Sequence, residues 1–295
     1  MAKITWGGPW TEQKLDAFEK YVKAYLIIMN KNRDKFGWEL VYFDAFAGSG
    51  SRELEQKNEN RDKLFDITIE DEAVYRGAAE RVVNIDVRGF DYYYFIESDE
   101  TAKSELEERL KPIGAAKNLD LRFRSGDANE YLKKLAETMK IDIKFCSLTM
   151  IDPFGMQVNW ESIEQLKGTK TDLWILIPSG VIINRLLDRN GKLSHIEKLV
   201  SFFGLSEVEI KKHFYKKHTA RGLFDIEDEV QKVSEPFQKI AEVYIQQLRT
   251  IFKCVTLEPL VLPSSRNIPI YHFAFASNNA TALKIANEII GRKNK

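Results

Sequence analysis

The sequence is poor in cysteine and histidine, and it has no surplus of charge of either sign. Its 295 residues include two cysteines and four histidines, while 44 Lys and Arg balance 44 Asp and Glu. Cys146 and Cys254 sit inside apolar runs without metal-type spacing, so we expect two buried thiols in a reducing cytoplasm. The zero net charge argues against a non-specific polyanion binder but allows a local basic groove.

Long hydrophobic runs are also missing. The first ten residues lack the apolar stretch of a signal peptide. The longest apolar runs, such as Leu173–Ile177, are strand-sized and too short to span a bilayer. We therefore expect a cytoplasmic protein with no membrane partner. The composition, 44% hydrophobic and 30% charged, is that of a globular chain with ample material for a core.

Short apolar stretches alternate with helical patterns over the first 180 residues. Helical spacing of apolar residues predicts a first helix over Thr11–Lys31, and the apolar stretch WELVYFDAF follows it. A later helix begins near Glu100, and we expect Pro112 to end it. The alternation is typical of βαβ units, which build a mostly parallel sheet covered on both faces by helices.

The last third of the chain changes character. Residues 181–252 have an all-helical pattern, and two strands and a final helix then complete the same sheet. We therefore predict an α/β protein with a single domain over 1–295 and a seven-stranded, mostly parallel sheet. An N-terminal arm and helix occupy 1–35, and a helical insertion occupies 181–252.

Acidic residues follow four of the expected strands. In open α/β sheets, ligands bind outside the carboxyl ends of the strands. Carboxylates gathered at one edge repel one another, so a purely structural sheet does not explain the repetition. The strand ends deliver Asp44 with the glycine loop FAGSG, then Glu97, Asp127, and Asp152 in DPFG.

The glycine loop matches neither common phosphate-binding loop. A Walker A motif requires Lys followed by Ser or Thr after its last glycine, and Ser51 and Arg52 stand there instead. The dinucleotide fingerprint requires a third Gly or Ala where Glu53 stands, and an acid about 20 residues further on. A nicotinamide oxidoreductase is therefore the weakest hypothesis.

An adenosine ligand with a hydroxyl-rich ribose and a zwitterionic tail, S-adenosylmethionine, fits these residues better. Glu97 would accept hydrogen bonds from the ribose hydroxyls, Asp127 one from the adenine amine, and Asp44 would face the ammonium. A ligand-free turn and helix capping by the acids are the alternatives. The candidate cofactor-binding residues are Asp44, Phe46, Ala47, Gly48, Ser49, Gly50, Glu97, Asp127 and Ala128.

Four motifs, DAFAGSG, FIESD, SGDA and DPFG, resemble in this order motifs I to IV of class I S-adenosylmethionine-dependent methyltransferases. With WTEQKLDAFEKYVKAY and DLWILIPSG, the resemblance extends over nearly the whole chain to the three-Cys-motif partner proteins. That bacterial and phage family is named for a neighbouring gene product with three cysteines. The resemblance implies a Rossmann-like class I methyltransferase fold, S-adenosylmethionine as cofactor, and a three-cysteine-motif protein as partner.

The DPFG motif is similar to the Asp/Asn/Ser-Pro-Pro-aromatic motif of enzymes that methylate an exocyclic base amine. In those enzymes the polar side chain and a proline carbonyl hold the amine, and the aromatic ring stacks on the base. Phe154 stands here in place of the second proline. The resemblance implies catalytic roles for Asp152, Pro153 and Phe154; a plain strand-end turn is the alternative. No strong base is required, because orientation alone supplies roughly 7–11 kcal/mol.

One stretch, KKHFYKKHTAR, is strongly basic and is predicted to lie on a helix. Its cations and aromatic rings suit RNA or DNA, although a solvated helix face explains them equally well. Its two histidines lack a third ligand, so no metal is predicted. For the chain as a whole, a cofactor-binding partner subunit without activity, or a methyltransferase acting on protein or a small molecule, remain alternatives. The candidate substrate-binding residues are Lys211, Lys212, Lys216, Lys217 and Arg221.

Overall fold

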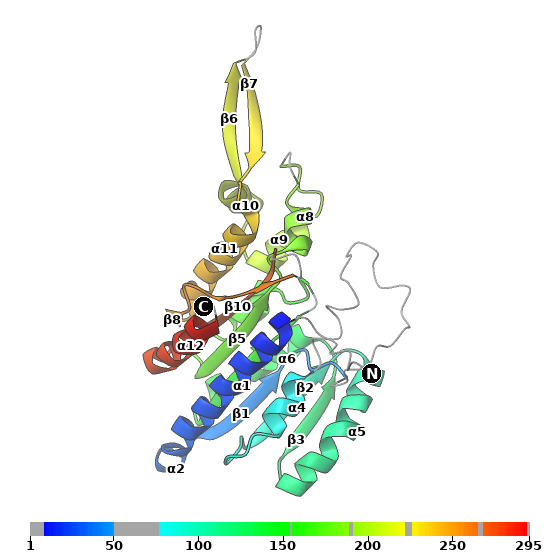
Figure 1. The fold of residues 1–295 in the computed structure, drawn as a ribbon, viewed down its shortest axis with the longest axis vertical. Coiled ribbons are helices and arrows are strands. Elements are labelled where there is room, and N and C mark those ends of the chain that lie inside the picture. The colour runs from blue at the N-terminus through cyan, green and yellow to red at the C-terminus, as the bar shows by residue number, and fades with distance from the viewer. Residues whose placement is uncertain are drawn as a thin grey trace.

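The fold is taken from a computed structural model, which describes residues 9–49, 77–153, 155–188, 191–221, 226–264 and 268–293 (Figure 1). Within these ranges, none of the helices has the length and apolar character required to cross a membrane.

A central sheet runs through the described residues in the order β3-β2-β1-β4-β5-β10-β8. The first five of these strands are parallel, and β10 runs antiparallel to β5. This is the Rossmann-like class I methyltransferase fold, and the fold prediction is confirmed. The bounds are β1 Glu39–Asp44, β2 Tyr92–Glu97, β3 Leu121–Ser125, β4 Phe145–Ile151, β5 Thr171–Ile177, β8 Cys254–Val255 and β10 Pro269–Ser277.

The edge strand beyond β10 is broken. β8 and β9 (Leu260–Pro263) both pair antiparallel with β10, on the side away from β5. Between them stands Pro259, which has no N–H to give to a sheet ladder. The sequence stretch FKCVTLEPLVL, expected as one strand, is therefore two short segments of the same edge.

Helices cover both faces of the sheet. Alternate strand residues face opposite ways, so Tyr42 joins one core cluster while Val41 and Phe43 join the other. The first cluster contains residues of α1 (Pro9–Asn30), α4 (Ala78–Val83), α5 (Glu100–Lys117) and α12 (Ala280–Lys293). The second contains residues of α6 (Ala128–Ile141), α7 (Trp160–Glu164), α8 (Val181–Leu186), α9 (Ile196–Phe203), α10 (Glu207–Phe214) and α11 (Pro236–Ile251). A short helix, α2 (Arg33–Phe36), precedes β1.

Pro112 does not end its helix, contrary to the prediction. It lies inside α5, which continues to Lys117 and ends at Asn118 in the left-handed region, with φ of 54°. Leu110 and Gly114 are buried on either side of it, while Pro112 itself is exposed. The hydrogen bond that proline cannot make is therefore lost on the solvent side, and core packing holds the helix together.

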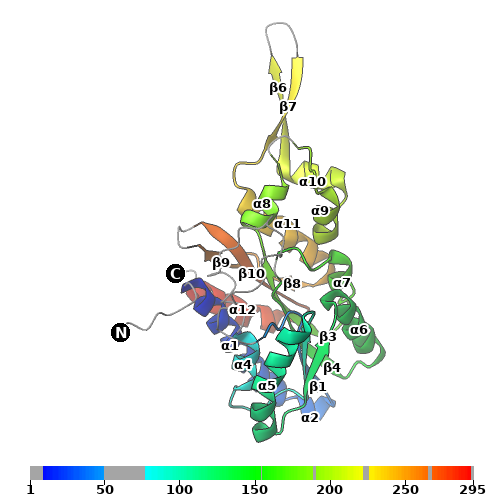
Figure 2. The ribbon, with the colours of Figure 1, turned by 90° about the vertical axis from the view of Figure 1, so that its right-hand side faces the viewer.

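The insertion is not all helical. β6 (Tyr215–Arg221) and β7 (Ile226–Lys232) form an antiparallel hairpin that projects away from the sheet (Figure 2). The buried side chain of Tyr215 donates to the carbonyl of Asp188 at 2.8 Å, and Val233 N–H donates to the carbonyl of Phe214 at 3.0 Å. These bonds end α10 and close the base of the hairpin, so the helical prediction is wrong for 215–221 and 226–232.

Gly37 and Gly204 have the same φ of 64° but different surroundings, so substitutions at the two positions distinguish the cost of backbone strain from the cost of overpacking. A Cβ on Gly37 would meet nothing within 4 Å, whereas one on Gly204, after α9, would lie 2.0 Å from Trp160 Cδ1 of α7. We expect Gly37→Ala to cost about 1 kcal/mol through its left-handed backbone. Gly204→Ala should cost about 1–3 kcal/mol more through overpacking. Urea unfolding of both variants measures the difference, and equal losses would contradict it.

Candidate functional site

The four acidic motifs meet at the carboxyl edge of the sheet. Asp44 and Glu97 are the last residues of β1 and β2, Asp152 follows β4 directly, and Asp127 caps α6 after β3. Because these strands are parallel and neighbouring, their carboxyl ends lie at the same edge (Figure 1). Asp44 pairs in register with Met150, two residues before Asp152.

The glycine loop is fixed to the end of β2 by backbone hydrogen bonds. Ala47 N–H donates to the carbonyl of Ile96 at 2.9 Å, and Gly48 N–H donates to Glu97 Oε2 at 3.0 Å. Gly48 has a φ of 62°, a conformation that favours glycine. Glu97 Oε1 accepts from Asp99 N–H at 2.9 Å. Ser98 Oγ also donates to Oε1, at 3.3 Å. Because a carboxylate oxygen has two lone pairs, Oε2 can still accept a ribose hydroxyl, and the half-buried Glu97 is held in place for it by these bonds.

Asn129 joins the end of β3 to the loop after β4. Asp127 Oδ1 accepts from the backbone N–H of Asn129 at 2.9 Å and from its Nδ2 at 3.0 Å. The same Nδ2 donates to the carbonyl of Gln157 at 2.9 Å, and Asn129 Oδ1 accepts from Asn159 N–H at 2.9 Å. Asp127 is therefore a helix cap, which was the alternative to cofactor binding in the sequence analysis. These bonds use Oδ1 and not Oδ2 of Asp127. Sequence reasoning missed Asn129.

Asp44 is a buried acid with a perturbed pKa. It is 2% exposed, accepts from the Tyr42 hydroxyl at 3.1 Å, and accepts from Phe46 N–H at 3.3 Å. Its pKa is raised to about 7, mainly by burial and in addition by the charge of Asp152. The two hydrogen bonds and the charge of Lys14 lower the pKa but do not cancel this increase. Near neutral pH this carboxyl exists in both protonation states.

Lys14 is a second residue at this edge that sequence reasoning missed. It comes from α1, is fully buried, and its Nζ donates to Asp152 Oδ2 at 2.5 Å. Burial raises the pKa of Asp152, which is 3% exposed, and Lys14 opposes that shift. The sequence does hold a signal, because Lys14 stands four and seven residues before the buried Phe18 and Tyr21, on the apolar side of the helix.

Two buried polar atoms at this edge lack a hydrogen-bond partner among the described residues: Ser49 Oγ in the glycine loop and Asp152 Oδ1. Such atoms are costly in a folded protein unless a ligand or water satisfies them. Together with the buried acid Asp44, they suit a cationic ligand that is rich in hydrogen-bond donors. S-adenosylmethionine is such a ligand, so the residues present fit this cofactor.

The structure places the other candidates as follows. Ala47, Ala128 and Pro153 are buried at the carboxyl edge, and Phe46 is half-buried. Gly50 and Phe154 lie outside the described residues. No cluster of three or more His, Cys, Asp or Glu suited to a metal ion occurs in the described part of the chain.

The basic cluster is divided and lies away from the acids. Lys211 and Lys212 are exposed on α10, and Lys211 pairs with Glu207 at 2.6 Å. Lys216, Lys217 and Arg221 belong to β6, which the hairpin carries away from β1–β4 in both views (Figures 1 and 2). The partner strand β7 contributes the acidic run Glu227–Glu229, which pairs in register with His218–Ala220, between the basic positions. The helix predicted for the whole cluster is therefore wrong beyond Phe214.

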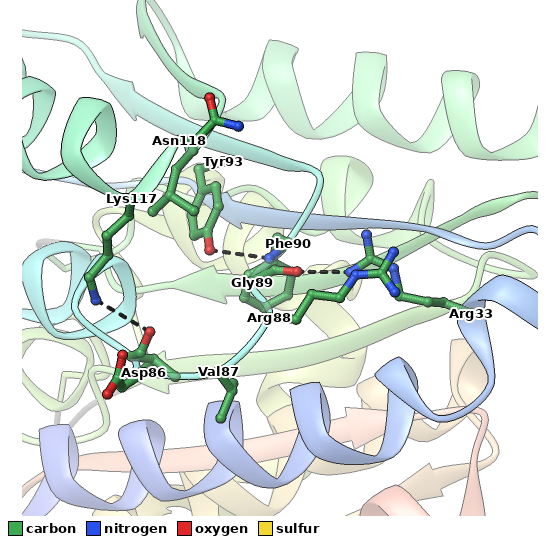
Figure 3. A pocket seen from close by; sticks show the side chains of 11 residues that line it. Arg33, Asp86, Val87, Arg88, Gly89, Phe90, Tyr93, Lys117 and Asn118 are labelled. Carbon is green, nitrogen blue, oxygen red and sulfur yellow. Dashed lines mark hydrogen bonds between the residues drawn. The ribbon is translucent and has the colours of Figure 1, made fainter.

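A cavity of about 460 Å³ lies at the amino ends of the parallel strands, opposite the carboxyl ends (Figure 3). Its walls come from residues that precede β1, β2 and β3, including Arg33, Arg88 and Lys117, and from Tyr93 of β2. Arg33 donates to the carbonyl of Gly89 at 2.9 Å and pairs with Asp91, while Arg88 pairs with Asp34. Because the cavity is at the amino ends of the strands, it is separate from the acidic site.

No family model matches this chain, and no curated protein matches it. Among solved structures, it is similar to the crystal structure of a proposed rRNA-methylase from Clostridium thermocellum. The two share 13% sequence identity with a TM-score of 0.26, and the match covers 70% of this chain and 97% of that chain. A similarity this low carries no argument about function, so the functional conclusions rest on the site.

Replacing Asp44 by asparagine tests the buried acid. Because its pKa is about 7 in the folded chain and 3.8 in the reference state, folding retains its proton between these values. Its contribution to the free energy of unfolding should therefore fall as pH rises from 4 to 7, by at most about 4 kcal/mol. Asp44→Asn removes this loss, so the variant should gain stability relative to the native chain above pH 7.

Urea unfolding gives the difference in free energy of unfolding between Asp44→Asn and the native chain, and this difference is compared at pH 5 and pH 8. The matched control is Asp86→Asn, which changes an exposed aspartate. A stability difference for Asp44→Asn that is the same at both pH values would show that this carboxyl ionises normally.

Proposed function

We propose that this chain is an S-adenosylmethionine-dependent methyltransferase whose acceptor is an amine, with the exocyclic amine of a nucleic-acid base favoured. One observation carries the proposal. Asp152 Oδ1 is a buried hydrogen-bond acceptor without a donor among the described residues, at a strand end beside the cofactor candidates. An amine N–H of an acceptor substrate would satisfy it.

The cofactor supplies an electrophilic methyl group on a sulfonium. The chain's residues would orient it: Glu97 would accept from the ribose hydroxyls, Asp127 from the adenine amine, and Asp44 with Ser49 would bind the amino-acid tail. Glu97 is suited to this role because two backbone N–H groups already fix its carboxylate. A preoriented acceptor loses less conformational freedom on binding.

The acceptor amine would be held by the residues after β4. Asp152 Oδ1 accepts one amine N–H, and this directs the nitrogen lone pair away from the carboxylate. The carbonyl of Pro153 is the second acceptor implied by the motif. Holding the nitrogen in line with the methyl group is the main catalytic task, since the displacement is a single step that depends on orientation.

The motifs quoted from the sequence also support membership in the three-Cys-motif partner family. On that basis we propose a three-cysteine-motif protein as partner. One observation favours the alternative of a cofactor-binding subunit without activity: Lys14 already occupies Asp152 Oδ2. The deciding experiment is transfer of tritiated methyl from S-adenosylmethionine to RNA, DNA and protein extracts, with and without the partner. Label in none of these fractions would place the subunit alternative first.

Two substitutions separate cofactor binding from acceptor binding. Glu97→Ala removes charge-assisted hydrogen bonds that contribute about 1.5–3 kcal/mol each, so S-adenosylhomocysteine affinity should fall at least about tenfold. Asp152→Ala should leave that affinity within about threefold and abolish transfer. Calorimetry measures both affinities, with NAD as the negative control. Equal loss of affinity in the two variants would contradict the separate roles.

The basic cluster has its own test. If it holds phosphates, a charge reversal should weaken RNA or DNA binding and flatten its salt dependence, by a slope of about 0.7 per lost contact on single strands. Cofactor affinity should not change. The variant carries glutamate at Lys211, Lys212, Lys216 and Lys217. The control carries glutamate at four other exposed lysines, Lys167, Lys198, Lys253 and Lys284.

The readout is oligonucleotide binding over a range of salt concentrations. Equal weakening in both variants would show that only total charge matters. If no oligonucleotide binds the native chain more tightly than millimolar at low salt, nucleic acid is excluded as the acceptor.

A further inference from the structure

Lys14 reaches the end of β4 from a helix that is fixed at several points. Two turns further along α1, the hydroxyl of Tyr21 donates to Asp172 Oδ2 at 2.6 Å, near the start of β5. Gln13 Nε2 donates to the carbonyl of Lys293 in α12 at 2.6 Å, and Asp16 pairs with Lys293 at 3.1 Å. The helix therefore presents Lys14 to the carboxyl edge from a rigid position.

Stability alone does not account for a lysine at this position. The side chains of Lys14 and Asp152 are 0% and 4% exposed. Taking two charges out of water costs several kcal/mol per ion, and an apolar pair of similar volume is often at least as stable. Leu15, Phe18 and Val22 already bury α1 against the core. The ion pair calls for another reason, which the neighbouring acid suggests.

Asp44 and Asp152 stand at the ends of neighbouring parallel strands, and the charge of Asp152 raises the pKa of Asp44. Two buried carboxyls at neighbouring strand ends tend to share one proton. A shared proton on Asp152 would turn its free oxygen from an acceptor into a donor. The positive charge of Lys14, which meets Asp152 and not Asp44 in a hydrogen bond, assigns the ionised state to Asp152.

We propose that Lys14 is a positioning residue: it holds Asp152 ionised through Oδ2, so that Oδ1 remains a hydrogen-bond acceptor for the acceptor amine. This inference rests on the proposed function. The charged and titratable groups that face Asp152 are Lys14 from α1 and Asp44 and Tyr42 from β1. Among the described residues that face Asp152, Lys14 supplies the positive charge.

The test compares Lys14→Met with Lys14→Arg. Methionine keeps the unbranched shape without charge, and arginine keeps the charge. In Lys14→Met, the acid limb of the kcat/KM profile for methyl transfer should move up by about one pH unit or more. In Lys14→Arg, the limb should stay near its native position while kcat falls, because the geometry has changed. Lys20→Met, on the exposed side of the same helix, is the control and should match the native profile.

A loss of activity in Lys14→Met that is uniform across pH, with the acid limb unmoved, would indicate a structural role and overturn the proposal. Circular dichroism identifies a variant that fails to fold. In that case Lys14→Gln, which keeps a donor without a charge, takes the place of Lys14→Met with the same expected shift.

A second measurement needs no activity. The carboxyl carbons of the aspartates are labelled with carbon-13 in the cofactor-free chain, and Asp152→Asn assigns the signal of Asp152. That signal should titrate at higher pH in Lys14→Met than in the native chain. An unchanged titration overturns the role of Lys14 whatever the activity. The remaining outcome is that the titration shifts in Lys14→Met while the native chain methylates none of RNA, DNA and protein. That outcome overturns the proposed function, and the acceptor role of Oδ1 with it.

Discussion

The burial of two carboxyl groups at neighbouring strand ends is the constraint on which the rest of this site depends. β1 and β4 are adjacent and parallel, so Asp44 and Asp152 arrive at the same edge in the same low-dielectric surroundings. Burial makes the ionisation of either carboxyl costly there. Lys14 compensates one of them, and it comes from a helix some 140 residues earlier in the chain. The position of α1 across the sheet is thus tied to the chemistry at its edge.

Hydrogen bonds to backbone groups fix the loops that follow the strands at this edge. Glu97 ends β2 and also fixes the glycine loop after β1, because its oxygens accept from Gly48 and Asp99. Asn129 similarly fastens the turn after β3 to the loop after β4. The loops at the ends of β1–β4 are therefore linked by hydrogen bonds in two pairs, β1 with β2 and β3 with β4. A ligand bound at any one of them meets an edge that is already organised.

The sheet and the acids at its edge were predictable from the sequence, because apolar periodicity and strand-end residues are local signals. The Lys14–Asp152 pair joins residues 138 positions apart, and a contact of that kind leaves only a faint trace in a single sequence. Pro112 failed as a helix end because packing of Leu110 and Gly114 outweighs one lost hydrogen bond. The hairpin strands at 215–221 and 226–232 were missed because these polar segments have little apolar periodicity to distinguish them from a helix.

The charge of the site gives a reason why Asp44 forms no ion pair with any of the described residues. With both acids ionised, Asp44, Asp152 and Lys14 sum to one negative charge. S-adenosylmethionine carries one net positive charge, from its sulfonium and ammonium less its carboxylate. If Asp44 faces the ammonium, as we propose, the ligand supplies the missing cation and displaces the proton that burial retains there. The demethylated product has lost the sulfonium charge and is neutral overall. It would therefore gain less from an ionised Asp44 than the donor does, which favours exchange of product for donor after each transfer.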